Sequence, residues 1–131
     1  MRQRITFVSY PLAVARMTIN VRFRLRLYRG EGVAIGPGKV ALLEAITATG
    51  SISAAARSLG MSYRRAWLLV DELNRALKKP AVVAGAGGRH GGGAALTPLG
   101  EELVKRYRAV EETSRLAAAS DIDALARMLA P

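Results

Sequence analysis

Three short stretches between residues 36 and 77 repeat apolar residues every three or four positions, a pattern that predicts three helices. A proline opens the first stretch, and glycines end the first and the second. The predicted buried positions are Leu42, Leu43, Ile46, Ile52, Ala55, Ala56, Leu59, Ala66, Leu69, Val70, Leu73 and Leu77. Two helices joined by a tight glycine turn, the second starting in polar and basic residues, predict a helix-turn-helix.

Before these helices, residues 18–28 alternate between apolar and mostly basic positions, which predicts a half-buried strand. A turn at residues 29–32 and a short apolar run at 33–35 complete a predicted hairpin. The alternating arginines, Arg22, Arg24 and Arg26, form either a phosphate-binding face or a solvated face that blunts an exposed sheet edge. We favour the solvated face.

After the helices, two apolar runs at 81–84 and 94–97 flank the glycine-rich loop GAGGRHGGG and predict a wing of two strands. Arg89 and His90 lie near its tip, where an arginine fits a DNA minor groove or a phosphate. The alternative is a loop with incidental charges. The glycines match neither the dinucleotide-binding nor the phosphate-loop pattern, so the loop does not predict a nucleotide site.

Thr97 and Pro98 begin the last long predicted helix, with threonine as its cap and proline at its first position. One side of this helix carries the stripe Leu99, Leu103, Tyr107, Val110 and Ser114. We expect the stripe to form a dimer seam, and packing on the core of the same chain is the alternative. Ser120-Asp121 is predicted to cap a final helix over residues 122–129, whose apolar residues Ile122, Leu125 and Leu129 offer a second dimer patch.

The first turn of the third helix carries two arginines, where cations oppose the helix dipole at a cost of ~0.3–1 kcal/mol. A polyanion docked against that helix end accounts for them. The candidate DNA-contacting residues are Ser51, Ser53, Ser62, Tyr63, Arg64, Arg65, Arg89 and His90. The serines can cap helices with or without DNA, so their phosphate contacts are secondary hypotheses. Trp67 either packs between the helix and the wing, which we favour, or contacts a thymine methyl and sugar.

The composition of the chain limits the classes of binding partner that are expected. The chain of 131 residues carries a net charge of +10, which favours anionic partners, nucleic acid before a membrane surface. It has no cysteine, and no apolar run approaches the ~18–20 residues of a membrane span. No carboxylate pair, Ser/His/Asp set or metal-spaced cluster stands out in the sequence. We therefore expect a cytoplasmic protein that is not an enzyme and needs no cofactor or metal.

Residues 1–16 have a basic start and a short apolar run interrupted by Pro11, faintly like a secretory signal. We expect instead a poorly ordered leader, or an upstream start with the functional chain beginning at Met17. The predicted organisation is a leader over residues 1–17, a DNA-binding domain over 18–97 and a dimerisation helix with its tail over 98–131.

Three runs carry a family resemblance: GPGKVALLEAITATGSISAAARSLGMSYRRAW, VDELN and GGRHGGGAALTPLG. Together they resemble the N-terminal DNA-binding domain of ModE-type molybdate-dependent regulators, a winged-helix family related to LysR-type regulators. The resemblance covers residues 36–100 and implies a dimeric transcription regulator. Full-length members carry C-terminal molybdate-binding domains, for which a chain ending at Pro131 has no room, so no molybdate site is expected in it.

The predicted fold is mainly α with small β elements: a winged helix-turn-helix with an N-terminal β-hairpin and a long C-terminal dimerisation helix. The predicted function is sequence-specific transcription regulation by a homodimer on double-stranded DNA. Its operator would be an inverted repeat with half-sites ~34–36 Å apart. The alternative is a basic nucleic-acid-binding or chromatin-type protein without sequence preference or regulatory role. Sequence preference separates the two.

Overall fold

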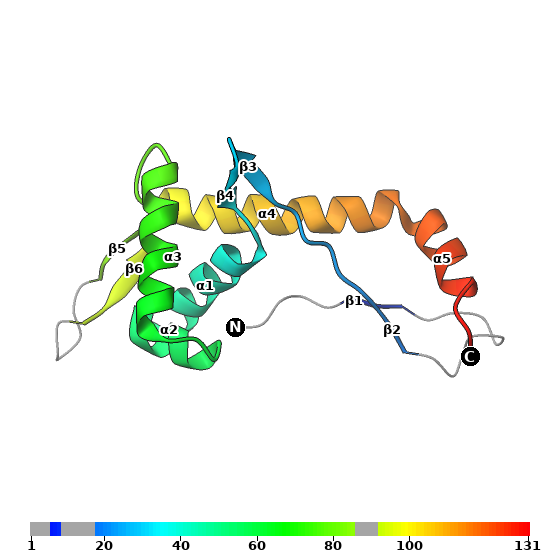
Figure 1. The fold of residues 1–131 in the computed structure, drawn as a ribbon, viewed down its shortest axis with the longest axis horizontal. Helices are drawn as coiled ribbons and strands as arrows, with labels where there is room; N and C mark the ends of the chain where they lie inside the picture. The colour runs from blue at the N-terminus through cyan, green and yellow to red at the C-terminus, as the bar shows by residue number, and fades with distance from the viewer. Residues whose placement is uncertain (1–5, 9–17, 86–91) are drawn as a thin grey trace. The chain divides into compact units, whose positions relative to one another are not determined.

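The computed structural model describes residues 6–8, 18–85 and 92–131 and has helices as its main elements, with short antiparallel strand pairs (Figure 1). The described elements are β1 (Thr6–Val8), β2 (Ile19–Val21), β3 (Leu27–Arg29), β4 (Gly32–Ile35), α1 (Pro37–Thr49), α2 (Ile52–Ser58), α3 (Tyr63–Ala76), β5 (Val82–Ala84), β6 (Ala94–Leu96), α4 (Pro98–Ala117) and α5 (Ala119–Arg127). The described residues between 24 and 107 form one compact unit, and those before 24 and after 107 form a second. The domain boundaries predicted after residues 17 and 97 separate parts that would fold independently. They stay predictions.

The strands form three separate pairs, β1 with β2, β3 with β4 and β5 with β6. Within the predicted leader, residues 6–8 form β1, which pairs with β2 so that Phe7 lies opposite Asn20. The other leader residues lie outside the described part of the chain. The predicted turn at residues 29–32 and the return strand at 33–35 are confirmed in the β3–β4 hairpin, with Gly30 in the left-handed conformation at its turn.

The single strand predicted over residues 18–28 is wrong, because β2 ends at Val21 and β3 begins at Leu27. Through residue 26 the predicted alternation holds, with the three arginines exposed and the intervening apolar residues half-buried. Leu27 is exposed, contrary to its predicted inward position. The pairing of β3 with β4 shifts register between Leu27 and Tyr28, and such a shift breaks a period-two pattern.

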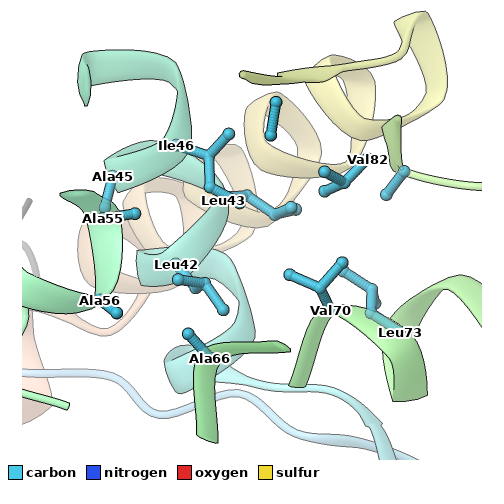
Figure 2. Close-up of a cluster of buried hydrophobic side chains, with 12 residues drawn as sticks. Leu42, Leu43, Ala45, Ile46, Ala55, Ala56, Ala66, Val70, Leu73 and Val82 are labelled. Carbon is cyan, nitrogen blue, oxygen red and sulfur yellow. The ribbon is translucent and has the colours of Figure 1, made fainter. Parts of the chain in front are cut away.

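The core of the first unit lies where α1, α2, α3 and β5 meet (Figure 2). Leu42, Leu43 and Ile46 of α1 are buried, as predicted. The buried residues of α2 are both alanines, and α3 buries Ala66 beside Val70 and Leu73. Small side chains let helix backbones lie near one another. The helical stripes of the sequence therefore predicted most of this core. Four of the predicted residues are only partly buried against it: Ile52, Leu59, Leu69 and Leu77.

The helix ends follow the local sequence. The hydroxyl oxygen of Ser51 accepts a hydrogen bond from the backbone N–H of Ala54 at 3.0 Å, and that of Ser62 accepts one from Arg65 at 3.1 Å. Gly50 adopts the left-handed conformation after α1, with φ of 83°. These caps and the glycine at the helix end confirm the predicted helix-turn-helix.

The predicted cap of the last helix is wrong. α5 begins at Ala119, so Ser120 and Asp121 lie inside its first turn instead of capping it. The backbone N–H of Ala118 donates to Ser114 at 3.0 Å, and the N–H of Ile122 donates to Ala118 at 2.9 Å. Ala118 thus closes α4 through its N–H and opens α5 through its carbonyl, so the cap position falls on an alanine, whose side chain cannot cap a helix.

A buried lysine ties the β3–β4 hairpin to the helices of the first unit. The ammonium of Lys39 donates to the carbonyl oxygen of Val33 at 2.7 Å and lies 3.5 Å from a carboxylate oxygen of Glu72 on α3. Arg29, at the end of β3, donates to the carbonyl of Ala76 at 3.0 Å, where the C-terminal end of α3 favours a cation. Both contacts fix the hairpin against α3.

The start of α4 lies close to the segment that leads into β5. The Thr97 hydroxyl donates to the Pro80 carbonyl at 2.7 Å and accepts from the Gly100 N–H at 3.1 Å. A Cβ atom added to Gly100 would lie 2.3 Å from the carbonyl oxygen of Ala81. The first turn of α4 can therefore approach this backbone only with glycine at position 100.

We predict that Gly100→Ala lowers the free energy of unfolding by about 1–3 kcal/mol, because the added methyl group forces the backbone of Ala81 away from α4. Urea denaturation followed by circular dichroism measures the change. The control is Gly38→Ala in α1, where an added Cβ meets no atom within 4 Å and is expected to be neutral or to stabilise by up to about 1 kcal/mol. Equal stability of the two variants would contradict the prediction.

Candidate nucleic-acid interface

The exposed first turn of α3 carries the residues predicted to contact DNA. Tyr63, Arg64 and Arg65 follow the Ser62 cap and are all exposed. Within the described residues, neither guanidinium pairs with a carboxylate. Both charges thus stand at the helix end whose dipole is already positive, which favours an anionic partner at this surface.

The other end of α3 is electrostatically different. Arg75, in the last turn of α3, forms a hydrogen-bonded ion pair with Asp71. The hydrogen bond and the negative charge of the Asp71 carboxylate raise the pKa of Arg75. Glu72 lies within the same turn and faces Lys39. Asp71 therefore compensates Arg75, the one cation in the C-terminal half of α3, whereas Arg64 and Arg65 at its N-terminal end stay available.

The three candidate serines have different surroundings. Ser51 and Ser62 use their hydroxyl oxygens as helix caps. Ser53, in the first turn of α2, is exposed. Phosphate contacts by these serines stay predictions.

The wing is a two-stranded hairpin formed by β5 and β6. Val83 lies opposite Ala95, and the pairing continues into the loop through a hydrogen bond from the Gly85 N–H to the Gly93 carbonyl at 2.9 Å. The N–H of Ala94 donates to the Gly50 carbonyl at 2.8 Å, which joins β6 to the end of α1. The predicted contacts Arg89 and His90 lie outside the described residues.

A residue without a predicted role joins α3 to the wing. The side-chain oxygen of Asn74 accepts from the N–H groups of Ala81 at 2.8 Å and Val82 at 3.2 Å, and its amide nitrogen donates to the Val82 carbonyl at 3.1 Å. Asn74 belongs to the run VDELN, which carries part of the family resemblance. The available signal was an asparagine, a poor helix former, inside a predicted helix. The three hydrogen bonds fix the start of β5 against α3.

The predicted dimerisation stripe on α4 is divided between two environments. Leu103 packs against the core cluster, and Tyr107 is only 3% exposed, with its hydroxyl donating to the Leu25 carbonyl at 2.7 Å. For these two residues, the structure agrees with the alternative prediction, packing on the core of the same chain. Val110 is exposed, whereas Leu99 and Ser114 are half-buried. Only part of the stripe is therefore open to a second copy.

Within residues 6–8, 18–85 and 92–131, no group of three or more histidine, cysteine, aspartate or glutamate residues could hold a metal ion. Over the same residues, no helix combines the length and apolar character needed to cross a membrane.

The helix-turn-helix, the β5–β6 wing and the exposed start of α3 define a winged helix-turn-helix protein. Residues 38–101 match the family model of the bacterial regulatory helix-turn-helix protein, lysR family. These residues therefore form a LysR-type helix-turn-helix domain, as the sequence runs predicted.

Similarity to individual proteins extends beyond this domain. The chain is 54% identical over 80 residues to the molybdenum-pterin-binding protein MopB of Rhodobacter capsulatus, an alignment that covers 61% of this chain and 30% of MopB. It is 43% identical over 88 residues to the molybdenum transport protein ModE of Azotobacter vinelandii. This alignment covers 67% of this chain and 33% of that protein. It is 37% identical over 91 residues to the DNA-binding transcriptional dual regulator ModE of Escherichia coli K12. This alignment covers 68% of this chain and 35% of that protein.

These similarities confirm the ModE-type resemblance of the helix-turn-helix region. The chain spans about a third of the length of the curated relatives that it matches.

We predict that Asn74→Ala exposes the N–H of Ala81 to solvent exchange and lowers the free energy of unfolding by about 1–3 kcal/mol, since three hydrogen bonds between α3 and β5 are lost. Amide hydrogen exchange followed by NMR measures the protection. Asn74→Asp is the matched control, because a carboxylate still accepts from Ala81 and Val82 but cannot donate. Protection of Ala81 should survive in this variant, and unchanged protection in Asn74→Ala would refute the assigned role.

Proposed function

We propose that this protein binds double-stranded DNA with sequence preference and acts as a transcription regulator in the cytoplasm. The observation that carries the proposal is the pair of exposed arginines without carboxylate partners, Arg64 and Arg65, in the first turn of α3. In a helix-turn-helix, the first residues of the second helix reach base edges in the major groove. An arginine that donates two hydrogen bonds to guanine is worth ~1–3 kcal/mol of discrimination between bases.

The alternative is a basic protein that coats nucleic acid without sequence preference. A net charge of +10 suits both functions, so charge alone does not separate them. The position of two charges favours the regulator, because Arg64 and Arg65, which have no carboxylate partner among the described residues, lie on the helix that faces bases in this fold. Arg89 and His90 are proposed to add contacts from the wing, to a minor groove or to phosphates.

The decisive experiment is fluorescence anisotropy of the purified protein on its own upstream intergenic DNA and on a scrambled duplex, each over a salt series. We expect a preference of ~10³-fold or more that persists at physiological salt. Equal affinities that fall together as salt rises would leave a non-specific binder and would overturn the proposal.

We predict that Arg64→Ala or Arg65→Ala weakens binding to the intergenic DNA by about 10- to 100-fold, the loss of one arginine–base contact. Thermal stability should stay unchanged, because both side chains are exposed. Arg75→Ala is the matched control, since it removes the same charge from the far end of the same helix, where Asp71 pairs with it. Equal losses on both duplexes, with the salt slope reduced by about 1, would assign these arginines to phosphates instead of bases.

We also propose that the protein acts as a homodimer on an inverted repeat. The support is an unusual concentration of exposed apolar side chains near the C-terminal end, including Leu125 at 62% and Met128 at 77% exposed. Val110 on α4 is exposed as well. A symmetric dimer would cover these side chains and would match an operator of two equal half-sites.

We predict that the wild-type protein has the mass of a dimer in light scattering after size-exclusion chromatography. Leu125→Asp should shift it to a monomer, because a charge replaces an apolar contact in the interface. Leu27→Asp, at another exposed leucine on the β3 strand of the first unit, is the control and should leave the mass unchanged. A monomeric wild type would contradict the proposal.

A further inference from the structure

A cavity of about 420 Å³ lies between α3 and the wing. Its lining includes Tyr63, Trp67 and Val70 of α3, Ser53 of α2, Val83 of β5 and Gly93 before β6. Three of its large side chains are widely exposed: Tyr63 at 56%, Trp67 at 46% and Val83 at 45%. Exposed aromatic and apolar side chains that gather at one concave site favour a binding role over a packing role.

This cavity lies on a different side of α3 from the arginines. Tyr63, Trp67 and Val70 are spaced by four and three residues and so share one helix face, the face toward the wing. Arg64 and Arg65 line a separate surface hollow with Leu68. The helix therefore presents two surfaces at its N-terminal half, a basic one and an aromatic one.

The fold determines what can enter the aromatic cavity when DNA is bound. A recognition helix occupies a major groove, and a wing contacts the adjacent minor groove or its edge. Major and minor grooves are separated by one sugar–phosphate backbone. That backbone must pass between α3 and the β5–β6 wing, which is where the cavity lies.

The lining also matches the chemistry of a backbone step. A deoxyribose presents an apolar face at its unsubstituted 2′-carbon, which suits the Trp67 ring and the Val83 side chain. The phosphates on either side of the sugar accept hydrogen bonds from hydroxyl groups such as those of Ser53 and Tyr63.

We propose that the cavity between Trp67 and Val83 receives one deoxyribose of the DNA backbone in each half-site, and that this contact selects DNA against a 2′-hydroxyl at that position. The inference rests on the proposed DNA binding and adds a specificity-determining residue to it. A ribose at the same position would press its hydroxyl against the indole ring and bury it without a partner.

The test is a ribonucleotide scan of the shortest intergenic duplex that keeps full affinity. One nucleotide at a time is replaced by its ribo form, and binding is measured by fluorescence anisotropy. For the wild type we expect about a 10-fold loss at one backbone position in each half-site, the cost of one buried hydroxyl without a partner. Trp67→Ala should bind more weakly overall and lose the sensitivity at that position.

Leu68→Ala is the matched control, because Leu68 is the next residue along α3, is also exposed and lines no part of this cavity. This variant should keep the position-specific loss. The competing possibility is that Trp67 contacts a thymine methyl group. A parallel scan that replaces each thymine by deoxyuridine tests it, since this change removes the methyl group and leaves the sugar unchanged.

Trp67 is the sole tryptophan of the chain, so its fluorescence reports on this cavity without any substitution. We expect acrylamide quenching of Trp67 to fall when the intergenic duplex binds. Unchanged quenching, a flat ribonucleotide scan, or a Trp67-dependent loss in the deoxyuridine scan would each overturn the sugar contact. If the protein binds the scrambled duplex equally well, the proposed function fails and the inference fails with it. A preserved sequence preference with a flat ribonucleotide scan refutes the inference alone.

Discussion

The burial of α3 against α1 and α2 is the interaction on which the rest of the helix-turn-helix unit depends. Ala66 of α3 and Ala55 of α2 are fully buried in one apolar cluster with the leucines of α1, and Ala55 lies beside Ala45 of α1 (Figure 2). Small side chains bring the helices close, and close packing leaves little freedom for either helix to rotate. The orientation of the exposed face of α3 follows from this packing, so the core determines where Arg64 and Arg65 point.

The two halves of α3 differ in their contacts with the rest of the chain. Its C-terminal half holds the surrounding structure in place: Asn74 binds the start of the wing, Glu72 faces the buried Lys39, and the last carbonyl groups accept from Arg29 of the hairpin. Its N-terminal half makes few such attachments and leaves its polar and aromatic side chains exposed. A single helix therefore joins the hairpin, the core and the wing while keeping one end free for a partner.

Local interactions explain why the helices were predictable. A serine cap, a glycine at a helix end and an apolar stripe act within a few residues, so the sequence of α1, α2 and α3 specifies their limits almost completely. The exposed arginines were predictable for the same reason, since a cation in a first turn is visible without tertiary contacts. The strands of the wing were predicted to within one residue, whereas the limits of β2 and β3 were not, because these two depend on their partner strands β1 and β4.

The sequence by itself thus determined the helix-turn-helix, its caps and the two arginines at the start of α3, through short-range hydrogen bonds and periodicity. Only the tertiary structure revealed that Asn74 binds the wing and that Gly100 must lack a side chain beside Ala81. It also decided that Tyr107 is buried within its own chain while Val110 is exposed. Each of these outcomes depends on contact between segments that the sequence separates by several residues or more, and periodicity along one helix carries no information about what lies opposite it.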